Sequence, residues 1–192
     1  MRIVAGRHRG RVLDSPPGTD VRPTSDRARE SLFNILEHGK LAAGGLSPIR
    51  GARVLDAFCG TGALGLEALS RGAAHVTFLD SDAASLRLAK ANATKLDESG
   101  HANFLQADAT RPPAGQACSL IFLDAPYGND LTASALAALA KNGWLAPGAI
   151  VVAETGLSEG LVPPAGFTAA DERRYGKAKL TFLIWTKPAA SG

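Results

Sequence analysis

The chain has 192 residues, of which 45% are hydrophobic and 20% charged, and a net charge of +3, values typical of one globular domain. No uninterrupted apolar stretch approaches the roughly 20 residues that span a bilayer, and no apolar run follows the basic start, so we expect a cytoplasmic protein. The two cysteines, Cys59 and Cys118, lie far apart without CxxC spacing, so neither a disulfide framework nor a metal site is expected.

Positive charge is concentrated at the start of the chain. The first twelve residues hold four arginines and no acid, interleaved with Gly6 and Gly10. Because guanidinium groups pair bidentately with phosphate oxygens, such a segment can follow a nucleic-acid backbone. The alternative interpretation is a solvated basic tail.

A helix is predicted next, beginning near Pro23 with Thr24 or Ser25 as its cap and ending at Gly39. From Arg53 onward the chain alternates short apolar runs with helical patterns, which predicts a parallel sheet with helices on its faces. The expected strands cover residues 54–58, 76–79, 103–107, 119–123 and 150–153, and the expected helices cover residues 63–71, 82–96 and 131–140. Residues 170–175 and 180–185 are typical of an antiparallel hairpin that completes a seven-stranded sheet.

The first of these strands runs into a glycine-rich loop that begins at Asp56. Gly60, Gly62 and Gly65 fit the pattern GxGxxG, and Asp80 ends the next strand, as in dinucleotide-binding proteins. An oxidoreductase that binds NAD is therefore one alternative. Asp56 argues against it, because a carboxylate before the loop repels a pyrophosphate and attracts a cation. S-adenosylmethionine carries both an ammonium and a sulfonium group.

Two further acids follow strands. Asp108 comes after the third strand, where it can accept a hydrogen bond from an adenine amine or serve as an ordinary turn residue. Asp124-Ala125-Pro126-Tyr127 follows the apolar run of residues 120–123. An acid and an aromatic ring just past a strand end suit a planar amine, although Asp and Pro are also common in plain turns.

These residues carry a resemblance to known proteins. The run from Asp56 to Gly62, with Asp80, Asp108 and Asp124-Ala125-Pro126-Tyr127, resembles the Rossmann-like, S-adenosylmethionine-dependent amino-methyltransferases. More specifically, the chain resembles the RsmD family, which methylates a guanine exocyclic amine of small-subunit ribosomal RNA. That likeness rests on Gly6-Arg7-His8-Arg9-Gly10-Arg11, Arg22-Pro23-Thr24, Asp26-Arg27 to Leu32-Phe33-Asn34, Tyr175-Gly176 and Leu180-Thr181-Phe182.

The resemblance implies a class I methyltransferase fold that binds S-adenosylmethionine and acts on the guanine N2 amine of 16S ribosomal RNA, free or in an assembling small subunit. It implies an RNA-contacting extension over residues 1–45, a methyltransferase domain over residues 46–188 and a tail over residues 189–192. We expect a monomer that needs no metal or membrane. The implied catalytic residues are Asp124, Pro126 and Tyr127; the cofactor residues are Asp56, Phe58, Gly60, Gly62, Asp80, Ser81, Asp108 and Ala109; and the RNA-binding residues are Arg7, Arg9, Arg11, Arg22 and Arg27.

One position departs from the family. Its members usually have two prolines between the acid and the aromatic residue, whereas the first of these is Ala125 here. Alanine lacks the fixed φ of proline, although Pro126 still favours an extended Ala125. The alternatives that remain are a methyltransferase for adenine or guanine amines in DNA or another RNA, and an RNA-binding protein without enzymatic activity.

Overall fold

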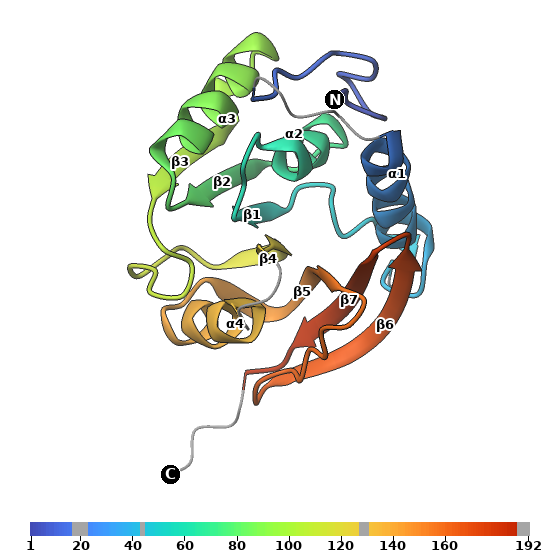
Figure 1. Cartoon of the computed structure of the whole chain (residues 1–192), viewed down its shortest axis with the longest axis vertical. Coiled ribbons are helices and arrows are strands. Elements are labelled where there is room, and N and C mark those ends of the chain that lie inside the picture. The colour runs from blue at the N-terminus through green and yellow to red at the C-terminus, as the bar shows by residue number, and fades with distance from the viewer. Residues whose placement is uncertain (17–22, 43–44, 127–130, 188–192) are drawn as a thin grey trace.

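The computed structural model describes residues 1–16, 23–42, 45–126 and 131–187. Its centre is a seven-stranded sheet in the order β3-β2-β1-β4-β5-β7-β6 (Figure 1). The strands are β1 (Arg53–Ala57), β2 (His75–Asp80), β3 (Ala102–Gln106), β4 (Cys118–Asp124), β5 (Leu145–Gly156), β6 (Phe167–Tyr175) and β7 (Ala178–Trp185). Strands β1 to β5 are parallel, and β7 runs antiparallel to both β5 and β6. The Rossmann-like fold expected from the sequence is confirmed.

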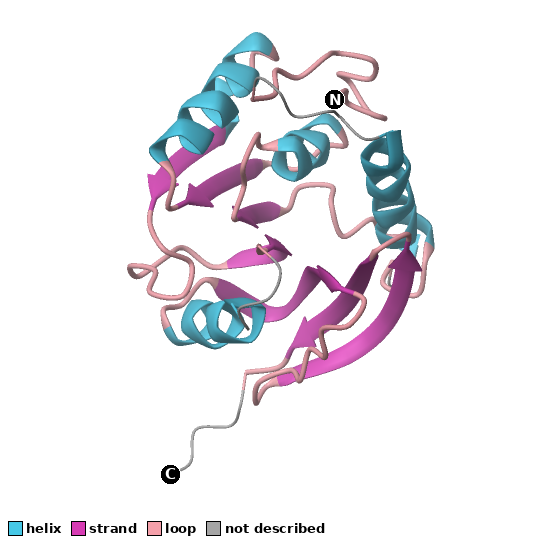
Figure 2. Ribbon diagram, in the orientation of Figure 1, coloured by secondary structure: helices cyan, strands magenta, loops and turns pink. Residues whose placement is uncertain are grey.

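Helices cover both faces of the sheet (Figure 2). On one face lie α1 (Pro23–His38), α2 (Ala63–Ser70) and α3 (Ala83–Lys95), and on the other lies α4 (Leu131–Lys141). A short 3-10 helix, η2 (Ser99–His101), precedes β3 and was not expected. Across the part of the chain that the structure describes, none of the helices has the length and apolar character needed to cross a membrane.

The central strands are buried on both faces because helices pack on each side. Side chains at alternate positions enter opposite hydrophobic clusters. In β4, Phe122 packs with the helices of the first face, at 5.5 Å between ring centroids from Phe33 of α1, while Ile121 and Leu123 join α4 on the second face. This burial holds the carboxyl ends of the parallel strands at one edge.

Two glycines of the GxGxxG pattern allow α2 to approach β2 closely. A Cβ atom on Gly65 would lie 2.4 Å from the ring of Phe78, and one on Gly62 would lie 3.1 Å from the same ring. Gly62 also has φ +78°, a left-handed conformation that favours glycine. Packing therefore accounts for Gly62 and Gly65.

Residues 1–14 fold into an N-terminal hairpin that lies over α2 and α3 (Figure 1). Arg2 and Val12 pair in antiparallel fashion, and Ile3 and Leu13 are buried in the same hydrophobic cluster as Phe33 and Phe122. The basic segment is thus part of the folded core and is not a solvated tail. The division at residue 45 remains a prediction, since both parts share this cluster.

A buried carboxylate, Glu67 of α2, holds the N-terminal hairpin in place. It accepts hydrogen bonds from the Val4 amide at 2.8 Å, the Ala5 amide at 3.0 Å and Nε of Arg71 at 2.8 Å. Nε of Arg29 in α1 lies 3.6 Å from the same carboxylate. A buried charge is tolerated only when it is paired and hydrogen-bonded, so these partners fix the hairpin and α1 to α2 together.

Candidate active site

Four acids lie at the carboxyl ends of neighbouring strands. Asp56 stands near the end of β1, Asp80 ends β2, and Asp124 ends β4 directly opposite Glu154 of β5. In open α/β sheets this edge is where ligands bind. The clustering of these carboxyl groups is the main electrostatic feature of the edge.

Asp56 is buried beneath the glycine loop. Its Oδ2 accepts a hydrogen bond of 2.8 Å from the amide of Gly65, the third residue of α2. The first amides of a helix lack partners within the helix, so this carboxylate caps α2 from β1. Burial, together with the charges of Asp124 and Asp80, raises the pKa of Asp56 from 3.8 to about 8, although the Gly65 hydrogen bond acts in the opposite direction.

This arrangement disfavours an anion at the start of α2. Helix N-termini commonly bind phosphate through their free amides, but here Asp56 already bonds to one of them. The open side of the loop lies at Gly60, where an added Cβ atom would have no other group within 4 Å. Backbone open to a ligand, surrounded by carboxylates that repel one another, fits a cationic group better than a pyrophosphate.

Asp80 ties the glycine loop to the loop after β2. Its Oδ2 accepts from the Gly60 amide and its Oδ1 from the Asp82 amide, both at 2.9 Å. Asp82 in turn caps α3, accepting from the Ala84 and Ser85 amides at 3.1 and 2.9 Å. The two loops are therefore linked through the Asp80 carboxylate at the sheet edge.

Asp108 closes a turn of its own. One carboxylate oxygen accepts from the amide and hydroxyl of Thr110 at 2.8 and 2.7 Å, and the other lies 3.3 Å from Arg111. The Thr110 hydrogen bonds and the Arg111 charge lower the pKa of Asp108. Within the chain, Asp108 thus acts as a turn residue. An additional hydrogen bond from its carboxylate to an adenine amine remains a prediction.

The other expected cofactor residues differ in accessibility. Phe58 is half-buried and has φ +60°, a conformation that is strained for an aromatic residue. Ser81 is exposed, whereas Ala109 is buried in the hydrophobic cluster on the α4 face. Phe58 and Ser81 can reach a ligand at this edge, and Ala109 supports the loop from beneath.

Asp124 is exposed at the end of β4. Partial desolvation and the neighbouring Glu154 carboxylate raise its pKa above the usual range of an aspartate. Ala125, the residue that departs from the family, is buried, and Pro126 is exposed. Tyr127 lies outside the described residues.

Cys59 in the glycine loop is a buried thiol. Burial and the charges of Asp56 and Asp80 raise its pKa, so it stays protonated and is a poor nucleophile. Among residues with a described placement, no group of three or more His, Cys, Asp or Glu side chains is positioned to hold a metal ion.

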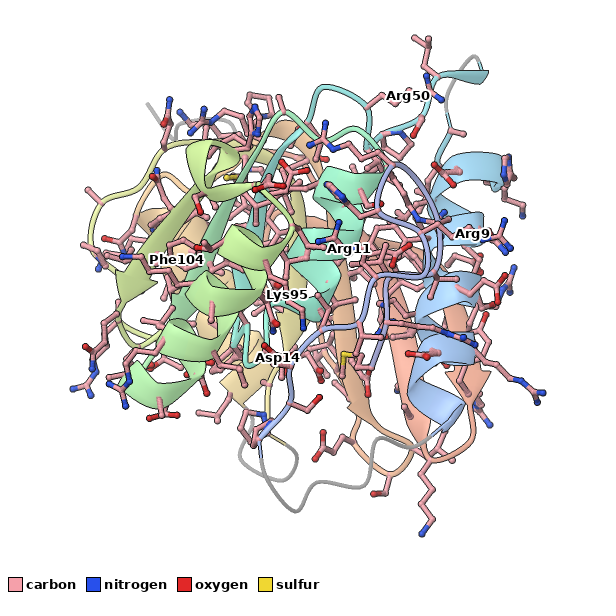
Figure 3. The ribbon with its side chains drawn as sticks, turned by 90° about the horizontal axis from the view of Figure 1, so that it is seen from above. Arg9, Arg11, Asp14, Arg50, Lys95 and Phe104 are labelled. Atoms are coloured by element: carbon pink, nitrogen blue, oxygen red, sulfur yellow. The ribbon has the colours of Figure 1, made fainter. Side chains whose placement is uncertain are left out.

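The structure places the predicted RNA-binding arginines in different environments (Figure 3). Arg7 pairs with Glu98 at 2.5 Å, and Arg11 donates to the Lys95 carbonyl at 2.6 Å. Exposed Arg9 and Arg27 line one cavity of about 530 Å³ between the N-terminal hairpin and α1. Arg22 lies outside the described residues. Arg9 and Arg27 are thus brought together from segments separate in the sequence.

The comparisons with known proteins agree with this geometry. The family model described as Conserved hypothetical protein 95 matches residues 1–184. Ribosomal RNA small subunit methyltransferase D of Escherichia coli strain K12 is 38% identical over 181 residues, which cover 92% of this chain and 86% of that protein. The chain belongs to this methyltransferase family. The protein of the same name from Haemophilus influenzae is 35% identical and covers 92% of this chain and 89% of its own length.

Solved structures extend this family assignment to the fold. The structure of yhhF from Escherichia coli superposes with a TM-score of 0.81 at 33% identity and covers 97% of this chain and 98% of its own. Magnesium protoporphyrin IX methyltransferase from Synechocystis, solved with bound SAM, has a TM-score of 0.65 at 17% identity, and covers 87% of this chain and 82% of its own. The latter supports the fold alone. The resemblance to the RsmD family inferred from sequence motifs is confirmed.

The sequence motifs did not identify Glu154 as a site residue. It directly follows the apolar run of residues 150–153, so its position just after a strand was a usable signal. Only the register of β4 with β5 places it opposite Asp124, however.

We expect Asp56→Asn to stabilise the protein in a pH-dependent way. The folded protein holds the Asp56 pKa near 8, well above its ordinary 3.8, so the folded state binds this proton more tightly than the unfolded chain does. The resulting contribution to the free energy of unfolding is fully present below pH 4 and is lost as pH rises toward 8. Asparagine keeps an acceptor for the Gly65 amide and does not ionise. In urea unfolding without cofactor, the free energy of unfolding of the variant will therefore rise relative to that of wild type by about 1.4 kcal/mol per pH unit between pH 5 and pH 7.

The control is Asp97→Asn, which removes one negative charge from an exposed position. The free energy of unfolding of this variant will differ from that of wild type by a nearly constant amount over the same pH range. If Asp56→Asn behaves like the control, the interpretation of Asp56 as a buried, proton-binding carboxylate is wrong.

Proposed function

We propose that the protein transfers a methyl group from S-adenosylmethionine to the exocyclic N2 amine of a guanine in small-subunit ribosomal RNA. The observation that carries the proposal is the position of Asp124 at the end of β4 beside β1, where Asp56 pairs with Phe122, two residues before Asp124. An acceptor for an amine thus lies beside a loop that suits a cation. Relatives at 35% and 38% identity are named for ribosomal RNA methylation, which supports the choice of substrate.

The glycine loop would hold S-adenosylmethionine. Its ammonium and sulfonium charges suit the Asp80 carboxylate at the glycine loop, a cation bound there favours the ionised form of Asp56, and the open backbone at Gly60 gives room for it. Asp80 retains lone pairs for the ribose hydroxyls, with Phe58, Ser81 and the Asp108 loop around the adenosine. When bound, the cofactor supplies an activated methyl group on sulfur.

Asp124 would activate the guanine amine. The amine lone pair is delocalised into the ring, so the amine becomes nucleophilic only when acceptors on its N–H bonds favour a pyramidal nitrogen. Asp124 and the carbonyl of Ala125 or Pro126 supply such acceptors. The amine would lose one proton when it is methylated, and Asp124 would accept that proton, because its raised pKa suits it to do so. Tyr127 would stack on the flipped base.

The N-terminal hairpin and α1 would bind the RNA backbone. Arg9 and Arg27 face one cavity together with Arg2, and the acids Asp26 and Glu30 also line it. Arg7, Arg11 and Arg22 complete the set expected from the sequence. We assign the partner as ribosomal RNA, free or in an assembling small subunit, bound by residues 1–45 and methylated by residues 46–188 of a monomer.

Asp124→Ala will lower methyl transfer by about 10³-fold, because loss of a proton acceptor and of transition-state charge stabilisation costs on this order. Binding of S-adenosylmethionine, measured by calorimetry, will remain nearly unchanged. Transfer of a labelled methyl group is measured on 16S RNA transcripts, isolated small subunits and DNA. Wild-type turnover by the variant would contradict the proposed role, and methylation of DNA alone would favour the alternative substrate.

Glu154→Gln will move the acid limb of the rate profile to lower pH. The Glu154 carboxylate raises the pKa of Asp124, so removing its charge lowers that pKa and keeps Asp124 ionised in more acidic solution. The turnover number is measured from pH 5 to pH 9. Glu172→Gln on β6 removes a charge away from Asp124 and serves as the control. If the acid limb of the Glu154→Gln profile stays in place or moves to higher pH, the effect of Glu154 on the Asp124 pKa is refuted.

Arg9→Ala and Arg27→Ala will each reduce the salt dependence of RNA binding. Each lost phosphate contact lowers the slope of log affinity against log salt by about 0.7 to 0.9. Binding of the 16S transcript is measured between 50 and 300 mM salt. Lys141→Ala on α4, across the sheet, is the matched control and will keep the wild-type slope. Equal slopes in all three variants would exclude the cavity as a phosphate site.

A further inference from the structure

A single buried side chain, Asn92 of α3, bonds to both the N-terminal hairpin and the glycine loop. Its Oδ1 accepts from the Asp14 amide at 2.7 Å, and its Nδ2 donates to the Asp14 carbonyl at 3.1 Å and to the Thr61 carbonyl at 3.0 Å. Asn92 is fully buried, so loss of a partner would leave a buried polar group unsatisfied. The two segments are therefore held in a fixed relation.

Thr61 has a second contact with the N-terminal hairpin. Its hydroxyl donates to Sδ of Met1 at 3.8 Å. Thr61 stands between Gly60 and Gly62, which both have positive φ angles, so its carbonyl is directed by the conformation of the loop. A change in the glycine loop would move the group that Asn92 binds.

The other described hydrogen bonds and ion pairs of the N-terminal hairpin bypass this loop. Ser70 and Glu67 bind it from α2, and Glu98 binds Arg7 and His8. Lys95 pairs with Asp14 at 2.7 Å, but both side chains are exposed, and such surface pairs contribute little (Figure 3). These contacts anchor the hairpin without touching Thr61.

We propose that Asn92 is a positioning residue that couples the cofactor loop to the RNA-binding hairpin, so that cofactor and RNA bind with positive cooperativity. The inference rests on the proposed function. A cofactor that orders the glycine loop fixes the Thr61 carbonyl, which strengthens the hold of Asn92 on Asp14 and orders the hairpin that carries Arg9. RNA bound to the ordered hairpin stabilises the loop in return, because such coupling is reciprocal.

The test is a binding cycle with S-adenosylhomocysteine, which has no methyl group to transfer, and a 16S RNA transcript. Wild type will bind the transcript about fivefold or more tightly when S-adenosylhomocysteine is saturating. Saturating transcript will raise the affinity for S-adenosylhomocysteine by the same factor. In Asn92→Ala this factor will fall to about one. In Asn92→Asp, which is nearly isosteric, the carboxylate still accepts from the Asp14 amide but donates to neither the Asp14 nor the Thr61 carbonyl, and the factor will fall likewise.

Lys95→Ala is the matched control, since it removes a contact between the same hairpin and helix that does not reach the loop. In this variant each ligand will tighten binding of the other by the same factor as in wild type. A second readout is hydrogen exchange at the Leu13 and Asp14 amides, which S-adenosylhomocysteine will slow in wild type and not in Asn92→Asp. This readout does not require RNA.

The outcomes separate the two proposals. If wild type binds both ligands with no mutual effect, or if the Asn92 variants keep the full factor, the coupling is refuted and the proposed function stands. If wild type binds neither S-adenosylhomocysteine nor the transcript, the proposed function fails and the coupling fails with it.

Discussion

The hydrogen bond from the Gly65 amide to the buried Asp56 carboxylate fixes the start of α2 over the end of β1. This contact occupies an amide that a phosphate would otherwise use, and it places an acid beneath the loop that is to hold a ligand. The close packing of Gly62 and Gly65 on Phe78 brings these groups together. A glycine pattern shared with dinucleotide-binding proteins thereby offers one helix amide fewer to an anion.

The arginines in and around the N-terminal hairpin fall into a buried group and an exposed group. Arg29 and Arg71 are buried around Glu67, whereas Arg9 and Arg27 remain exposed. Buried arginines hold the segment to the body, whereas the exposed ones stay at the surface, free to meet a ligand.

Much of the fold was predictable because its signals are local. Apolar runs and helical spacing gave most strands and helices of the main domain to within a few residues, although β5 begins five residues before the expected position 150. Asp124 stood out as an acid directly after a buried strand. The pairing of Asp124 with Glu154, the hold of Asn92 on Thr61 and the burial of Glu67 depend on contacts between residues distant in the sequence. A basic segment that folds on α2 and one that stays solvated have the same composition, so composition could not separate them.

The long sequence separation of these contacts also sets the order in which the molecule can be completed. Arg7 meets Glu98, which follows it by 91 residues, and the Ser31 hydroxyl meets that of Tyr175 across 144 residues. Because translation proceeds from the N-terminus, the first residues made must wait for both α2 and α3 before all their contacts can form. Such non-local pairing also slows folding. The arginine-bearing surface is therefore a late product of folding, and a chain whose synthesis stops before α3 lacks the contacts that shape it.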